Sequence, residues 1–186
     1  MRISSTGVLL DDPKRSTPGY LLIRPADGNK PFLLDPKGDV AREWSTGGGI
    51  TNWSYLLPNG NLLANEHCPD RKGVALTVSG RISEYDADGN LVWRHDDPYQ
   101  HHDVRRLSDG AIYAAFSELN EADKARIQGG VPGSETLGGP FGEVIRQVND
   151  AGDVVWEWSL MSLDLARYPL HRNSNRWSYG HINTVL

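Results

Sequence analysis

The sequence predicts an all-β fold built from repeated four-stranded antiparallel sheets. Two different hairpin-turn signals recur along the chain, and they alternate with each other. The composition agrees with this prediction, because the 186 residues include 20 Gly, 11 Pro, 6 Trp and 7 Tyr, which suits many short strands joined by tight turns. A chain of this length can also bury one ordinary hydrophobic core.

The first signal is an acidic or amide residue, two further residues and a glycine, followed by a β-rich stretch that contains tryptophan. It occurs three times, at 35–38 before Trp44, at 86–89 before Trp93 and at 149–152 before Trp156. Asp or Asn favours the start of such a turn, and Gly supplies the positive φ angle that the turn requires. We interpret these tryptophans, together with Trp158, as residues that pack between neighbouring sheets.

The second signal is a Leu-x-(Asn/Asp)-Gly-type turn between strands. Residues 57–63 match residues 107–113, with an offset of 50, and residues 181–186 then occupy the place of 102–107. Two interleaved hairpin signals that recur about every 40–50 residues are typical of β-propeller blades. A β-sandwich is the alternative, but a sandwich does not repeat its own turns in register, so the pattern favours a propeller.

We expect twelve strands in all. In chain order they are 19–24, 31–35, 40–44, 53–57, 61–65, 81–86, 90–94, 103–107, 111–116, 143–149, 153–158 and 182–186. These make about three four-stranded blades, whereas propellers close with ~4–8 blades, because an open ring leaves sheet edges exposed. Residues 1–186 are therefore predicted to be a single partial propeller domain. A fragment is favoured over a half-ring that a second copy of the chain completes as a homodimer.

The repeat spacing stretches once, and we expect residues 117–141 to form an insertion loop. Ser117 is predicted to cap a short helix that runs to Ile127 and ends at Gly129–Gly130. The Gly- and Pro-rich remainder predicts a surface loop, which is either a tolerated insertion or a lid over one end of the propeller.

Charge and cysteine content exclude several classes of partner. The formal net charge is 19 − 24 = −5 without a basic block, which argues against nucleic acid and anionic membranes as partners. No stretch approaches the ~18 apolar residues of a membrane span. The single cysteine, Cys68, allows no intrachain disulfide, and the first ten residues lack a signal-peptide pattern, so we expect a cytoplasmic protein or one whose leader has been removed. No CxxC or HxxxH spacing suggests a metal site, and we expect no cofactor.

Three polar residues fall at one position of the repeat. Alignment of the second turn signal places Asn52, His102 and His181 at equivalent sites. Each lies five residues before a Leu that recurs in the repeat, at 57, 107 and 186. If the strand that follows is the innermost of its blade, these side chains converge on one mouth of the central channel. Each could equally hydrogen-bond a loop of the neighbouring blade.

An ordered series of motifs resembles the bacterial arylsulfotransferases. The motifs are Pro-Gly-Tyr at 18–20, the segments 34–44 and 55–63, His-His-Asp at 101–103, Val-Trp-Glu-Trp at 155–158 and His-Ile-Asn-Thr-Val at 181–185. The resemblance covers nearly the whole chain from Thr6. It implies a six-bladed propeller, of which this chain would hold the N-terminal half. It also implies transfer of a sulfuryl group from a phenolic sulfate ester to another phenol, through a sulfo-histidine and without a nucleotide donor. Members of the family are often periplasmic.

The resemblance also implies site residues. His102 and His181 are the leading catalytic candidates, with Asp103 expected to orient an imidazole and Asn183 expected to hold the loop or donate to an oxyanion. The expected substrate-binding residues are Asn52, Arg105, Arg176 and His101. His101 is the weaker candidate, since adjacent strand residues point to opposite faces.

The chain departs from the family pattern in two places. Residues 176–179 replace the Asp-Trp that often precedes the His-Ile-Asn element, and the stretch after Trp158 lacks an Asp-His. The family's site also draws on blades of the second half, so which histidine is sulfated stays open. Two other classes compete: a non-catalytic propeller that binds a small aromatic or anionic ligand or a protein partner, and a metal-dependent hydrolase or lyase with His102, His181 and Asp103 as ligands.

Overall fold

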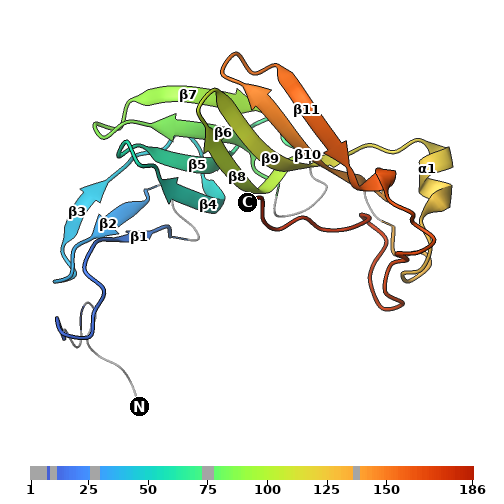
Figure 1. Ribbon diagram of the computed structural model, residues 1–186, viewed down its shortest axis with the longest axis horizontal. Coiled ribbons are helices and arrows are strands. Elements are labelled where there is room, and N and C mark those ends of the chain that lie inside the picture. Colours follow the sequence, from blue (N-terminus) through green and yellow to red (C-terminus); the bar gives the residue numbers. More distant parts are fainter. Residues whose placement is uncertain (1–7, 9–11, 26–29, 73–77, 136–138) are drawn as a thin grey trace.

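The computed structural model describes residues 8, 12–25, 30–72, 78–135 and 139–186, and in this part of the chain the strands form successive antiparallel sheets (Figure 1). The first sheet contains β1 (Leu21–Ile23), β2 (Phe32–Leu34) and β3 (Val40–Glu43). The second contains β4 (Ile50–Leu56), β5 (Leu62–His67), β6 (Gly80–Tyr85) and β7 (Leu91–Asp96). The third contains β8 (Gln100–Leu107), β9 (Gly110–Ser117), β10 (Gly142–Asn149) and β11 (Val154–Ser159). In each sheet, strands that are consecutive in sequence pair with each other.

This architecture confirms the all-β class and most of the predicted strands. The second and third sheets have the predicted four strands, whereas the first has three among the described residues. The predicted strand at 182–186 is wrong. The backbone amides of Ile182 and Val185 donate to the carboxyl groups of Glu143 and Asp103, at 2.9 Å in both cases, instead of joining a β-ladder.

The repeated turns have the geometry that the sequence predicts. In the β6–β7 turn, Oδ1 of Asp86 accepts hydrogen bonds from the backbone amides of Asp88 and Asn90, and Gly89 has a φ of +86°. Gly110, in the β8–β9 turn, is constrained more tightly, because a Cβ there would lie 1.8 Å from the carbonyl oxygen of Val148. These turns fix the order of strands within each sheet.

The predicted helix of the 117–141 insertion is present but begins later than expected. Helix α1 spans Glu121–Arg126, and Asn120 is its N-cap, whose side chain accepts a hydrogen bond from the amide of Asp123 at 2.9 Å. Ser117 is the last residue of β9, so its predicted capping role is wrong. The strand continues to Ser117 because that residue still pairs with Gly142 of β10.

The hydrophobic core lies between consecutive sheets. The larger cluster joins the second and third sheets and contains Leu63, Ile82, Val104, Ala111, Tyr113, Ala115, Val144 and Val148. A second cluster joins the first and second sheets and contains Trp44, Leu62, Ala64 and Tyr85. Each sheet therefore covers the apolar face of the sheet that follows it.

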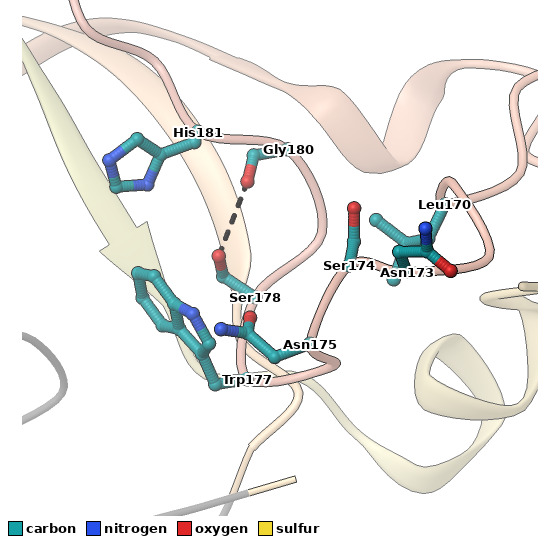
Figure 2. Close-up of a pocket in the computed structure, with 8 residues that line it drawn as sticks. All are labelled: Leu170, Asn173, Ser174, Asn175, Trp177, Ser178, Gly180 and His181. Carbon is teal, nitrogen blue, oxygen red and sulfur yellow. Dashed lines mark hydrogen bonds between the residues drawn. The ribbon is translucent and has the colours of Figure 1, made fainter. Parts of the chain in front are cut away.

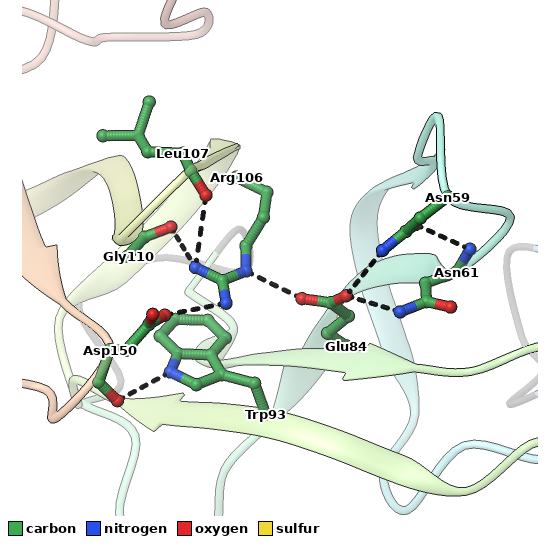
Figure 3. A network of polar contacts seen from close by, with 8 residues as sticks. All are labelled: Asn59, Asn61, Glu84, Trp93, Arg106, Leu107, Gly110 and Asp150. Carbon is green, nitrogen blue, oxygen red and sulfur yellow. Dashed lines mark hydrogen bonds and ion pairs between the residues drawn. The ribbon is translucent and has the colours of Figure 1, made fainter.

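A polar network around Arg106 also joins the second and third sheets (Figure 3). From β8, its guanidinium bonds Glu84 of β6 at 2.7 Å and Asp150 of the β10–β11 turn at 2.8 Å. The same group lies 4.5 Å from the ring centroid of Trp93, whose indole N–H donates to the Asp150 carbonyl at 3.0 Å. Arg106 of β8 thus contacts β6, β7 and the β10–β11 turn, and so links the second sheet to the third.

In the described residues, helices are short, and none has the length and apolar character needed to cross a membrane.

Candidate functional site

The segments that the repeat alignment treats as equivalent meet at Asp103. This residue is buried at the start of β8, and its Oδ1 accepts a hydrogen bond from the hydroxyl of Tyr55 on β4 at 2.6 Å. Its Oδ2 accepts from the amide of Val185 in the C-terminal segment at 2.9 Å. In Figure 1 the C-terminus accordingly lies beside β4 and β8. Asp103 therefore fixes the C-terminal segment, and its role in orienting an imidazole stays a prediction.

Three histidine rings gather beside Asp103. The ring centroids of His102 and His181 are 4.5 Å apart, those of His101 and His102 are 5.0 Å apart, and those of His101 and His181 are 6.1 Å apart. His101 is fully buried and stacks on Phe116 at 4.0 Å, whereas His102 is half-buried and His181 is exposed. The cluster thus extends from the core to the surface.

A β-bulge brings His101 and His102 to the same side. The register between β8 and β9 shifts between His101 and Val104, and His102 has a φ of +50°, in the left-handed region. The expectation that neighbouring strand residues point apart is therefore wrong here, and the two Nδ1 atoms lie 2.7 Å from each other. A non-glycine residue at positive φ is uncommon and is often found at functional sites.

A buried carboxyl group of β10 lies behind the cluster. Oε2 of Glu143 is 3.3 Å from Nε2 of His101, without the alignment of a hydrogen bond, and it accepts from the amide of Ile182 at 2.9 Å. Its Oε1 is buried and lacks a protein partner among the described residues. Glu143 and Asp103 together hold both ends of the segment that follows His181.

These contacts are compatible with one arrangement of the ring hydrogens that leaves Nε2 of His102 unprotonated. A hydrogen on Nε2 of His101 faces Glu143, which leaves Nδ1 of His101 to accept a hydrogen bond from Nδ1 of His102. Nε2 of His102 then has a free lone pair. Burial lowers the pKa of His102 to about 4, and the neighbouring His101 and His181 rings add to this effect. At neutral pH, His102 is therefore an uncharged imidazole with an available nitrogen.

The other predicted site residues lie at different distances from this cluster. Arg105 donates to Oδ1 of Asp103 at 2.6 Å, and its guanidinium lies 4.3 Å from the ring centroid of Tyr55. Asn183 is exposed, and its amide donates to the His181 carbonyl at 3.4 Å. Asn52 lies in β4, and its side chain is outside what the structure describes.

Arg176 is engaged elsewhere. Its Nη1 donates to the carbonyl of Gly129 at 2.7 Å, and its Nε lies 2.6 Å from a carboxyl oxygen of Glu135. The guanidinium thereby ties the insertion loop to the segment before His181. Its predicted role in substrate binding stays a prediction.

A pocket of about 360 Å³ opens next to His181 (Figure 2). Trp177 forms an aromatic wall, with its ring 5.6 Å from that of His181 in an edge-to-face arrangement. The remaining lining is mainly polar, and the full set is Leu170, Asn173, Ser174, Asn175, Trp177, Ser178, Gly180 and His181. An aromatic wall with polar groups around it suits a small ligand that carries an aromatic ring.

Sequence reasoning missed Glu143 and Trp177 as site residues. Glu143 has one sequence signal, since a charged residue stands between Phe141 and Val144 at the start of a strand. Trp177 attracted notice only as part of a departure from the family pattern. Neither signal indicates which histidine the side chain approaches, because that depends on the packing of β10 and of the C-terminal segment on β8.

The depressed pKa of His102 predicts a pH-dependent stability. The unfolded chain takes up a proton at His102 near pH 6.5, whereas the folded protein takes it up near pH 4. The free energy of unfolding should therefore decrease as the pH falls from about 6.5 to about 4. His102→Asn should flatten this dependence, because asparagine tolerates positive φ and does not titrate.

Chemical denaturation of both proteins at a series of pH values measures this effect. Burial also lowers the pKa of His95, so the variant should keep a shallower slope of the same sign. The matched control is His171→Asn, which makes the same substitution at an exposed histidine outside the cluster. Parallel curves for wild type and His102→Asn would contradict the assignment.

The arrangement lacks a metal centre in the described part of the chain. There, no group of three or more His, Cys, Asp and Glu residues is placed to hold a metal ion. The metal-dependent reading with His102, His181 and Asp103 as ligands therefore has no geometric support among these residues, since Asp103 bonds Tyr55, Arg105 and Val185.

Comparisons with known proteins give a partial picture. No family model matches the chain, and no curated protein matches it. A protein of unknown function from Bacteroides caccae is similar in structure over 86% of this chain and 49% of that chain, with 12% sequence identity and a TM-score of 0.46. BamB from Moraxella catarrhalis is similar over 76% of this chain and 46% of that chain, with 14% identity and a TM-score of 0.38. The chain spans about half the length of these two proteins, and neither similarity assigns a function.

Proposed function

We propose that the protein is an arylsulfotransferase-like enzyme in which His102 takes a sulfuryl group from a phenolic sulfate ester and passes it to a phenol. In this proposal the three sheets are blades of a six-bladed propeller, with β4 and β8 next to its central channel. The observation that carries the proposal is the half-buried, uncharged His102 ring with Nδ1 held by His101 and Nε2 free. The motif resemblance and the pocket beside His181 support it.

The chemistry follows from this ring. Nε2 of His102 attacks sulfur, the N–S bond forms, and the S–O bond to the aryl group breaks, with its electron pair leaving as phenolate. A phenol acceptor then attacks the same sulfur, its proton passes to the His181 ring that protonated the first phenolate, and the N–S bond breaks to release the imidazole unchanged. One hard transfer thereby becomes two easier steps.

Glu143 and His101 stabilise the charge that develops on His102. As the N–S bond forms, the His102 ring gains positive charge, and its Nδ1–H bond to His101 strengthens. Glu143, 3.3 Å beyond the His101 ring, provides a carboxyl group to compensate that charge in a buried setting. His181, exposed and 4.5 Å from the His102 ring centroid, is placed to donate a proton to the leaving phenolate.

A direct test uses 4-nitrophenyl sulfate as donor and phenol as acceptor. The purified chain should release 4-nitrophenolate in a phenol-dependent manner. With donor alone, mass spectrometry should find one added sulfuryl group on the peptide that contains His102. A folded protein that gives neither release nor a sulfated peptide contradicts the proposal.

The second candidate is a non-catalytic binding module. The pocket beside Trp177 and His181 favours it, because an aromatic wall with polar groups can hold an aryl sulfate without turnover. Calorimetry with 4-nitrophenyl sulfate separates the two candidates. Binding that is lost in Trp177→Ala, without 4-nitrophenolate release by the wild type, would favour the binding module.

A further inference from the structure

Consecutive sheets of this chain meet through the same kind of contact twice. Trp44, directly after the last strand of the first sheet, donates its indole N–H to the Asp86 carbonyl at 2.9 Å. Trp93, in the last strand of the second sheet, donates to the Asp150 carbonyl at 3.0 Å. Both acceptors lie in the β-turn that precedes the last strand of the following sheet. A tryptophan at the end of one sheet thus docks on the turn of the next.

The receiving surface is also the same in both contacts. It is an apolar cross-strand pair next to the turn, Leu62 and Tyr85 in the second sheet and Ala111 and Val148 in the third. All four side chains are buried. The turn position identifies the equivalent pair of the first sheet as Leu21 and Leu34, which are partners across β1 and β2.

The first sheet leaves its receiving surface open. Leu21 is 60% exposed, whereas its equivalents Leu62 and Ala111 are 0% exposed. A pocket of about 440 Å³ lies at this place, and its lining includes Leu21, Leu34 and the turn residues Asp35 and Pro36. Val8, residues 16–20 and Gly38 also line it. The position thus has the apolar pair, the turn and a hollow, but the structure places no tryptophan there.

The third sheet has an exposed tryptophan, Trp156, at the position from which Trp93 of the second sheet docks on the third. Trp156 stands four residues after the turn glycine Gly152, as Trp93 stands four residues after Gly89. Trp93 is half-buried against the third sheet, whereas Trp156 is 47% exposed. Among the described residues, β11 is an outer strand of its sheet. The exposed face of β11 and the open face of the first sheet are therefore complementary halves of one contact type.

The strands of each sheet also indicate that the third sheet and the first sheet have complementary ends. The second and third sheets each begin with a strand, β4 or β8, that the first sheet lacks among the described residues. By the repeat alignment, the equivalent of β4 and β8 after the third sheet is the segment 181–186, which joins no sheet. Leu56 pairs with Leu62, and Arg106 pairs with Ala111. The repeat alignment makes Val185 the equivalent of Leu56 and Arg106, and Leu21 is the equivalent of Leu62 and Ala111. Val185 should therefore pair with Leu21.

We propose that a second copy of this chain docks head to tail on the first. Trp156 of one copy enters the pocket next to Leu21 and Asp35 of the other, and residues 182–186 lie along the β1 edge as the fourth strand that this sheet lacks among the described residues. Both surfaces are on this chain, so two copies can make the contact twice and close a ring. Closure also covers the β1 edge, which an open sheet leaves available for pairing.

Sedimentation analysis of the purified chain tests the proposal, with Trp156→Glu and Leu21→Glu as the disrupting variants. The wild type should sediment as a dimer, and each variant as a monomer, because each buries a charge in both contacts. Val40→Glu is the matched control. Val40 is 58% exposed in the first sheet, and its equivalent Leu91 is 48% exposed although the third sheet is docked on the second, so this position lies outside the contact.

Mixing the two variants distinguishes the head-to-tail arrangement from a dimer in which both copies use the same surface. One copy then offers an intact Trp156 and the other an intact Leu21, so one contact can form, and some heterodimer should return. Circular dichroism checks that each variant is folded. A monomeric wild type would overturn the proposal. A dimer that both variants leave intact would overturn it as well.

Discussion

Replacing His102 by asparagine is expected to lower phenol-dependent release of 4-nitrophenolate by about 10³-fold or more, because the variant loses the nitrogen that carries the sulfuryl group. Asparagine is chosen because His102 has a φ of +50°, a conformation that asparagine adopts more readily than most residues. The circular dichroism spectrum should therefore stay unchanged. The sulfated peptide should disappear in the same variant.

A second variant separates the charge-compensating role of Glu143 from that of the nucleophile. Glu143→Gln keeps an acceptor for the amide of Ile182 but removes the carboxyl group behind His101. It should lower kcat by a smaller factor than His102→Asn and leave KM nearly unchanged. His171→Asn is the control and should retain full activity, since that side chain is exposed. Full activity in His102→Asn would contradict the assignment of the nucleophile.

Replacing Arg106 by alanine is expected to lower the free energy of unfolding by about 3 kcal/mol, because it leaves a buried carboxylate without its partner. The side chain of Glu84 is only 6% exposed. Although burial raises its pKa, hydrogen bonds from Arg106 and Asn61 hold the pKa of Glu84 below the usual value. The variant also loses the contact between the guanidinium and the Trp93 ring.

Urea denaturation at neutral pH measures this loss. Arg94→Ala is the matched control, because Arg94 is an exposed arginine on the neighbouring strand β7, and it should change the free energy of unfolding by less than about 0.5 kcal/mol. Equal effects of the two substitutions would mean that the Arg106 network does not join the sheets energetically.

Local sequence chemistry predicted the sheets well, because each turn depends on only a few adjacent residues. The Asp-x-x-Gly turns at 86–89 and 35–38 form where expected, with the side-chain oxygen of the Asp capping the turn amides. The prediction failed at 182–186, where two buried carboxyl groups hold the backbone amides. Those groups belong to β10 and β8, about 40 and 80 residues away in sequence.

The candidate site was predicted in part. The repeat placed His102 and His181 at equivalent positions, and the structure brings their rings together. Strand alternation wrongly separated His101 from His102, because a bulge is set by the pairing of two strands and not by either sequence alone. Arg176 looked available for a substrate, but the insertion loop engages it.

The sequence by itself determined the repeating all-β architecture, the turns and the residues that recur at one position of each repeat, because these depend on short-range periodicity. Only the tertiary structure decided the chemical state of His102. Its uncharged form results from burial beside two other rings. Desolvation and hydrogen-bond partners depend on what packs around a group, and residues distant in sequence supply that packing here.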